Sequence, residues 1–340
     1  MHFDLNFPVT ASGSTSQPKK NKNKQPQQSS STAFTPAQIK GIEARLDLLE
    51  HCLFISRYDT LSLRFNQSVN KKIDPKTHVN ILDELLKQLR ARPGTVFLKR
   101  LTIVLDNDSE KGFGLANANA SLVEPYDVIA LLPTTSATFS LACLTHSLPS
   151  PLTAHIIALP LTLPRLPFQL KHTLVRTAIK NGAVFEINYA GAIGGESDAS
   201  LSTFGVSDTG VSGKRNWWAA AREVVRVAKG KGIVVSGGVA SEADYRGPKD
   251  IANLLTLLGL AQNLAHDASV AAPKSLILRA QARKTYRAVL SEPRLMIPEA
   301  TQVVPPTQQT GGGENMRHNS IISEPSPDAA STNGRQEAGL

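Results

Sequence analysis

Residues 169–189 read QLKHTLVRTAIKNGAVFEINY, and this stretch decides the fold class. Its first part, 169–180, has the spacing of an amphipathic helix. Its last part, 183–188, is a nearly continuous apolar run of strand length. Near-continuous apolar strands that alternate with helices are typical of a parallel sheet with right-handed crossovers, so we expect an α/β fold.

The same alternation extends from this stretch in both directions. Strands are also predicted at 2–6, 60–65, 100–105, 127–132, 154–159 and 232–236, and helices at 36–50, 75–92, 216–229, 248–258, 260–268 and 273–290. Pro248 suits the first position of its helix and Gly259 suits its carboxyl-terminal cap. Seven strands over about 235 residues favour a closed TIM-like (β/α) barrel over an open sheet. No clean eighth strand is visible, so we expect it to be irregular or missing.

Two segments are too polar to form a core. Residues 10–35 are rich in Ser, Gln, Lys and Pro, and residues 297–340 in Pro, Gly, Ser, Thr and Gln. We expect both to be disordered. The predicted organisation is a barrel domain over 1–296, with the insertion 10–35, followed by a tail over 297–340. The lysines at 19–24 are either a nuclear-import or RNA-contact signal or part of a solvated linker.

The charge favours a polyanionic partner. The net charge is +9, and the residues from 297 onward contain five acids and two bases, so 1–296 carries +12. A basic folded region suits nucleic acid or an acidic membrane surface. The sequence has no uninterrupted run of eighteen apolar residues, so no membrane span is predicted. Its first residues do not have the pattern of a secretory signal. The two cysteines, Cys52 and Cys143, are interpreted as buried free thiols in a reducing compartment.

Catalytic motifs are weak. At the predicted strand ends, Asp106-Asn107-Asp108 suits either a divalent ion or a turn, and Gly237-Gly238 suits either a phosphate cradle or a tight turn. The eight histidines are scattered, and no P-loop or serine-elbow motif is present. A barrel metallohydrolase acting on phosphate esters is therefore the alternative hypothesis, and a scaffold that binds acidic proteins is a third.

Basic residues gather on three predicted helices. Each stripe could be a solvated helix face, but their repetition favours contact with nucleic-acid phosphates. Trp217-Trp218 is the strongest base-stacking candidate, with at least one indole expected in the core. The predicted RNA-binding residues are Arg165, Lys171, Arg176, Lys214, Arg215, Asn216, Arg222, Arg226, Arg246, Arg279 and Arg283.

Several segments together resemble one family, the TIM-barrel protein subunit shared by nuclear ribonuclease P and RNase MRP. The match covers about 250 residues in the family's order, although Lys249 stands where the family usually has an aromatic residue. The matching segments are FDLN (3–6), RLTIVLD (100–106), YDVIA (126–130), Pro133-Thr134, FSLAC (139–143), the block 165–189, KRNW (214–217), VVSGG (234–238) and RGPKDIANL (246–254).

The resemblance implies a nuclear and nucleolar protein that supports a catalytic RNA. That RNA, with its bound magnesium, would cut precursor tRNA at the 5′ end, and RNase MRP would act on pre-rRNA. The implied partners are the two catalytic RNAs, precursor tRNA and other protein subunits of the particle, without a membrane. The chain would belong to an endoribonuclease particle, and we expect the isolated chain to need no cofactor, bind no metal and have no catalytic residue of its own. The contacts that carry over by analogy are Arg165, Lys171, Arg176, Arg215, Asn216 and Arg246.

Overall fold

The computed structural model describes residues 2–9, 34–55, 61–70, 78–105, 115–194 and 210–284. These residues all belong to one compact unit, Met1–Pro293. The predicted tail 297–340, Asp106-Asn107-Asp108 and nearly all of the insertion 10–35 lie outside the described residues, so those expectations stay predictions.

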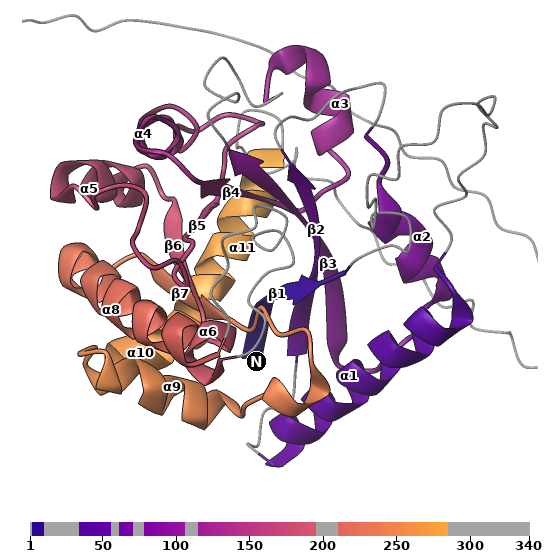
Figure 1. The fold of residues 1–340 in the computed structure, drawn as a ribbon. Helices are drawn as coiled ribbons and strands as arrows, with labels where there is room; N and C mark the ends of the chain where they lie inside the picture. The colour runs from indigo at the N-terminus through magenta and orange to yellow at the C-terminus, as the bar shows by residue number, and fades with distance from the viewer. Residues whose placement is uncertain are drawn as a thin grey trace, which may run out of the picture. The chain divides into compact units, whose positions relative to one another are not determined.

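All seven predicted strands are present, in one sheet with the strand order β1 to β7 (Figure 1). Every neighbouring pair is parallel, as the alternation of helices and strands predicts. After β7 the described chain contains only helices and loops, so no eighth strand is found there. The strands are β1 His2–Pro8, β2 Leu61–Asn70, β3 Thr95–Leu105, β4 Val128–Pro133, β5 Ile156–Ala158, β6 Val184–Asn188 and β7 Ile233–Ser236.

The helices follow the predicted pattern with three additions. Short helices α3 and α6 and the longer α4 were not predicted, and α4 begins at a capping box formed by Thr135 and Thr138. The α-helices are α1 Pro36–Ile55, α2 Ile81–Gln88, α3 Ala120–Val123, α4 Ser136–Leu144, α5 His172–Lys180, α6 Ala190–Ile193, α8 Gly210–Ala228, α9 Pro248–Leu257, α10 Gln262–Ser269 and α11 Ala271–Lys284; Asn117–Asn119 and Glu242–Asp244 form 3₁₀ turns.

Helix ends account for most differences from the sequence prediction. Pro248 is at the start of α9, and Gly259 follows that helix with φ 103°, both as expected. In contrast, α8 begins at Gly210 and not at residue 216. Glycines and serines make residues 210–213 resemble a loop, but Gly213 is buried in the structure. Tertiary packing has therefore overridden the low helix propensity of these residues.

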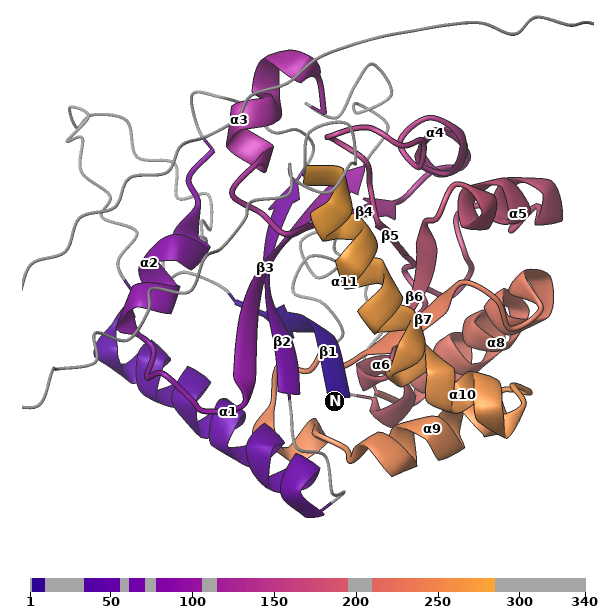
Figure 2. The same ribbon diagram turned by 180° about the vertical axis from the view of Figure 1, so that it is seen from behind.

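The sheet is curled so that its two edge strands meet. The backbone N–H of Gly238, just after β7, donates to the carbonyl of Asn6 on β1 at 3.0 Å. The N–H of Gly237 donates to Oδ1 of Asp4 on β1 at 2.9 Å. The two opposite views show α1, α2, α4, α5, α8 and α9 around the outside of the strands, with α11 against them from another side (Figures 1 and 2).

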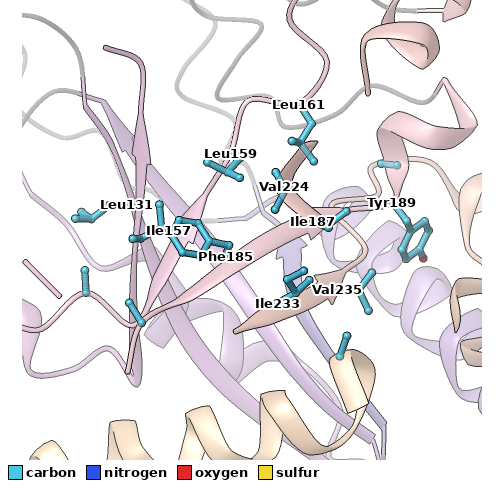
Figure 3. Close-up of a cluster of buried hydrophobic side chains, with 14 of the residues drawn as sticks. Leu131, Ile157, Leu159, Leu161, Phe185, Ile187, Tyr189, Val224, Ile233 and Val235 are labelled. Carbon is cyan, nitrogen blue, oxygen red and sulfur yellow. The ribbon is translucent and has the colours of Figure 1, made fainter. Parts of the chain in front are cut away.

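Apolar side chains fill both sides of the curled sheet. The larger cluster lies between the strands and the outer helices, where Phe185, Ile187 and Val235 pack near Val224 of α8 (Figure 3). The smaller cluster combines Phe3, Leu5 and other strand residues with Leu276 and Ala280 of α11. Both faces of the sheet are thus buried, which explains the near-continuous apolar strands. No helix in the described part of the chain is long and apolar enough to cross a membrane.

Candidate functional site

A groove runs between the segment that leads into α5 and one face of α8. We name it the α5–α8 groove; its volume is about 630 Å³. One wall consists of residues 163–171, which follow the carboxyl end of β5, and the other of α8 residues between 215 and 226. Loops at the carboxyl ends of parallel strands are the usual place for function in folds of this kind.

Buried contacts hold α8 in place beside the strands. Trp217 is 1% exposed, and its indole N–H donates to the carbonyl of Asn188 at the end of β6 at 2.7 Å. Gly191 lies so close to the indole that a Cβ there would overlap the ring. As expected, one tryptophan of the pair is in the core, and Trp218 packs edge-on against it with 5.4 Å between ring centroids. Trp218 is only partly exposed.

The other wall is fixed to the core and to α8. Phe168 is buried and stacks on Phe139 of α4 at 4.3 Å between ring centroids. The side-chain amide of Asn216 donates to the carbonyl of Thr162 at 3.2 Å. This hydrogen bond joins α8 to the segment just before residues 163–171. Asn216, predicted to contact RNA, thus holds the two walls of the groove together.

The charged residues that line the groove are mostly cations. Arg165, Lys171, Arg215 and Arg226 are all exposed there, and Glu223 is the one carboxylate among the described lining residues. Glu223 accepts two hydrogen bonds from Arg226, at 2.8 and 2.6 Å. These bonds lower the pKa of Glu223, so that it stays ionised and competes with any other anion for Arg226.

The structure brings five of the predicted residues together in this groove, Arg165, Lys171, Arg215, Asn216 and Arg226. Lys214, Arg222 and Arg176 are exposed on α8 or α5 without lining it.

The other predicted contacts lie elsewhere. Arg246 donates to the carbonyls of Ala243 and Tyr245 in its own loop. Arg279 donates to the carbonyl of Gly182 at 2.8 Å, which turns the guanidinium toward the start of β6. The side chain of Arg283 lies outside the described residues.

A buried polar network, which was not predicted from the sequence, occupies the interior of the curled sheet. Arg100 on β3 makes two hydrogen bonds to the carboxylate of Glu186 on β6. Ser236 on β7 lies 2.7 Å from Glu186 Oε1 and 2.6 Å from Asn188 Oδ1. Polar residues at every second position of a strand predicted to be buried, such as Glu186 and Asn188, were the available signal for an inward polar face.

The groups of this buried network are paired with one another. The small cavity nearby, between β1 and β7, holds only about 10 Å³. Among the described residues no group of three or more His, Cys, Asp or Glu side chains could hold a metal ion. The N–H groups of Gly237 and Gly238 donate within the fold, so they cannot form the phosphate cradle considered above.

The fold and the groove together define a basic α/β protein with an exposed cationic groove suited to a polyanion. The sequence identifies it further: a family model described as RNase P subunit p30 matches residues 12–285. The chain belongs to this family of ribonuclease P protein subunits, and the resemblance inferred from its segments is confirmed.

Individual relatives agree with this assignment. The chain is 30% identical to mouse (Mus musculus) "Ribonuclease P protein subunit p30", over 60% of this chain and 67% of the mouse protein. It is 25% identical to "Probable ribonuclease P protein subunit 3" of Schizosaccharomyces pombe, over 66% and 84% of the two chains. It is also 25% identical to "Ribonuclease P/MRP protein subunit RPP1" of Saccharomyces cerevisiae, over 51% and 50%.

Among solved structures, the chain is similar to one from "cryo-EM structure of archaeal Ribonuclease P with mature tRNA". The TM-score is 0.49 and the sequence identity 12%, over 88% of this chain and 100% of that one.

Proposed function

We propose that this chain is an RNA-binding subunit of ribonuclease P and RNase MRP that supports the catalytic RNA and does not cut RNA itself. The observation that carries the proposal is the α5–α8 groove, where Arg165, Lys171, Arg215 and Arg226 gather from two separate segments. Arginine and lysine bind phosphate through charge, and the planar arginine side chain can bind two phosphate oxygens at once. Such contacts supply affinity without reading base sequence.

The proposal includes the setting of this activity. The curled sheet is a seven-stranded TIM-like barrel, closed between β1 and β7 by the hydrogen bonds of Gly237 and Gly238. The chain acts in the nucleus, including the nucleolus, with other protein subunits of the particle. The RNA subunit carries the magnesium that cleaves precursor tRNA at its 5′ end, and the RNase MRP particle processes pre-rRNA.

A matched pair of variants tests RNA binding by the groove. The groove variant is Arg165→Gln, Lys171→Gln, Arg215→Gln; the control is Lys40→Gln, Lys87→Gln, Lys274→Gln. The control removes the same charge from exposed residues of α1, α2 and α11 that do not line the groove. Binding to a precursor tRNA transcript is measured from low to high salt. The groove variant should lose roughly one unit of log–log salt slope per lost phosphate contact, and the control much less.

Equal salt slopes for the two variants would overturn the RNA-binding role of the groove. The non-catalytic part of the proposal has a separate test, because the metallohydrolase alternative predicts activity of the isolated chain. Incubation of precursor tRNA with excess purified protein and Mg²⁺ should leave the RNA intact. Cleavage that a chelator abolishes would favour the alternative.

A further inference from the structure

A second groove lies beside α8, at the carboxyl-terminal end of this helix. We name it the α8–α10 groove; its volume is about 490 Å³. It is lined by residues of α8, by Leu258 and Leu260 in the connection from α9 to α10, and by Leu264 of α10. Arg226 lines this groove as well as the α5–α8 groove, so the two are neighbours along one helix.

The charge of the second groove is entirely positive. Arg222, Arg226 and Lys229 line it and are exposed, and none of the described lining residues is acidic. Glu223, the carboxylate that binds Arg226, lines only the α5–α8 groove. Because Arg226 is paired with Glu223, Arg222 and Lys229 supply the rest of the positive charge in this groove, and a bound anion would be attracted to them.

The backbone at the end of α8 gives this groove a defined shape. Lys229 has φ 52° and Gly230 has φ 73°, so two successive residues in the left-handed region end the helix. A Cβ on Gly230 would lie 2.8 Å from Leu264 Cδ1, which shows how closely this turn approaches α10. Leu258 and Leu260 are 3% and 5% exposed and close the groove with apolar atoms. Lys229 is therefore held at the edge of a built groove.

The distance along α8 matches a run of phosphates. Arg215 lies on α8 and Lys229 directly follows its last residue, so the fourteen residues between their positions correspond to about 21 Å at ~1.5 Å per residue. An RNA strand with phosphates spaced by roughly 3.4 Å along its axis, as in a duplex, would cover this length with about six nucleotides. An occupant of both grooves must be an extended polyanion, and the partner proposed for the first groove is RNA.

From these observations we infer that the RNA strand bound in the α5–α8 groove continues past Arg226 into the α8–α10 groove, where Arg222 and Lys229 bind its phosphates. This inference rests on the proposed function. It extends the RNA-binding surface along nearly the whole of α8 and makes Arg226 a contact common to both parts.

The experiment compares three full-length proteins with the wild type. The second-groove variant is Arg222→Gln, Lys229→Gln, the first-groove variant is Arg165→Gln, Lys171→Gln, Arg215→Gln, and Lys40→Gln, Lys87→Gln is the charge-matched control for the second-groove pair. Circular dichroism melting checks that each protein is folded. Binding is measured for oligouridylates of increasing length, from four to sixteen nucleotides, and for a precursor tRNA transcript at several salt concentrations.

We expect wild-type affinity to increase with RNA length until both grooves are filled. The second-groove variant should reach its plateau at a shorter length, and its salt slope should fall by roughly two units on precursor tRNA. The first-groove variant should bind more weakly at every length. A second-groove variant with the plateau and slope of its control would overturn the inference and leave the proposed function standing.

If neither groove variant loses affinity for RNA, both the proposed function and this inference are wrong. Polyglutamate is the probe for a different occupant, an acidic peptide. If the second-groove variant loses polyglutamate binding but keeps wild-type RNA binding, the groove serves a protein partner and the inference is wrong. The inference would also be wrong if the second-groove variant lost affinity equally for RNA fragments of every length. One continuous strand in both grooves requires the loss of affinity to depend on RNA length.

Discussion

Arg100 on β3 and Glu186 on β6 form an ion pair through the interior of the curled sheet, with Nη2 of Arg100 2.7 Å from Oε2 of Glu186. Two strands, β4 and β5, separate β3 from β6 in the sheet, so this contact requires the sheet to curl. The two side chains are 1% and 0% exposed. Nε of Arg100 also donates to Oγ1 of Thr102, and Nη1 donates to the carbonyl of Leu5 on β1.

Removing one member of this pair should strongly destabilise the fold. Arg100→Met leaves the Glu186 carboxylate buried without its cation, which costs about 3–5 kcal/mol in the free energy of unfolding. The measurement is chemical denaturation followed by circular dichroism. Arg90→Gln is the matched control, because Arg90 pairs with Asp47 at the surface, with side chains 67% and 58% exposed. It should cost less than about 1 kcal/mol. Equal losses in the two variants would contradict the special role of the buried pair.

The stability of the protein should depend on Asp4 between about pH 4 and 6. Burial raises the pKa of Asp4 from 3.8 to about 6, despite hydrogen bonds from the Gly237 and Asn6 backbones. The folded state then binds more protons than the unfolded state in this window, so the contribution of Asp4 to stability is lost as pH rises. A pKa difference of about 2 corresponds to roughly 3 kcal/mol.

Asp4→Asn isolates this contribution. The amide oxygen can accept the same two backbone hydrogen bonds and does not ionise, so the variant should lack the decrease in stability. The difference in free energy of unfolding between variant and wild type, measured from pH 4 to 8, should shift in favour of Asn as pH rises. A difference that is constant with pH would show that the carboxyl group titrates normally.

Glu223→Gln should strengthen RNA binding. The substitution removes the carboxylate that holds Arg226 at 2.6 and 2.8 Å, and so frees a cation common to both grooves. Exposed ion pairs of this kind contribute little, so the expected gain in affinity is at most roughly 5-fold. Glu124→Gln changes the net charge equally at an exposed residue outside both grooves. Titration of labelled precursor tRNA with both variants measures the effect. The same small gain in both would indicate a net-charge effect alone.

Gly191→Ala should displace α8. The new Cβ would overlap the indole of Trp217 and lie 2.9 Å from Thr162 Cγ2, so the helix or the α6 segment must move. Overpacking of this kind costs about 1–3 kcal/mol. Thermal melting, tryptophan fluorescence and RNA affinity should all change, since Trp217 fixes one wall of the groove. Gly41→Ala is the control, because nothing lies within 4 Å of its added Cβ on α1. It should keep wild-type fluorescence and be slightly more stable.

The parallel sheet could be predicted well because each strand is indicated by a short apolar run within its own stretch of sequence. Runs such as 183–188 are mostly apolar and of strand length, and each strand is found within a few residues of its predicted position. The meeting of residues 163–171 with α8 could not be predicted in the same way. It depends on how Trp217 and Asn216 contact Asn188 and Thr162, which are 29 and 54 residues away in the chain. Helical spacing predicted that Arg222 and Arg226 lie on one face of the helix. It could not predict the grooves on either side of that face.

Buried charges were the hardest part to foresee. Arg100 begins a predicted strand and Glu186 lies inside another, and each alone suggests an exposed position. Their burial becomes favourable only when the curled sheet brings them together. Arg279 makes another contact that helical spacing did not predict, because its guanidinium donates to the carbonyl of Gly182. Its RNA contact stays a prediction.

The hydrogen bond from Gly237 to Asp4 joins residues that are 233 positions apart. Synthesis on the ribosome produces β1 first, and β1 cannot acquire this neighbour until β7 has left the exit tunnel. Leu276 and Ala280 of α11, which cover Phe3 and Leu5, are made later still. A sheet that closes through contacts so distant in sequence forms slowly, and the apolar side chains of β1 lack their final cover until α11 has been made. The nascent chain therefore has a long period in which a chaperone can act on β1 before the sheet closes.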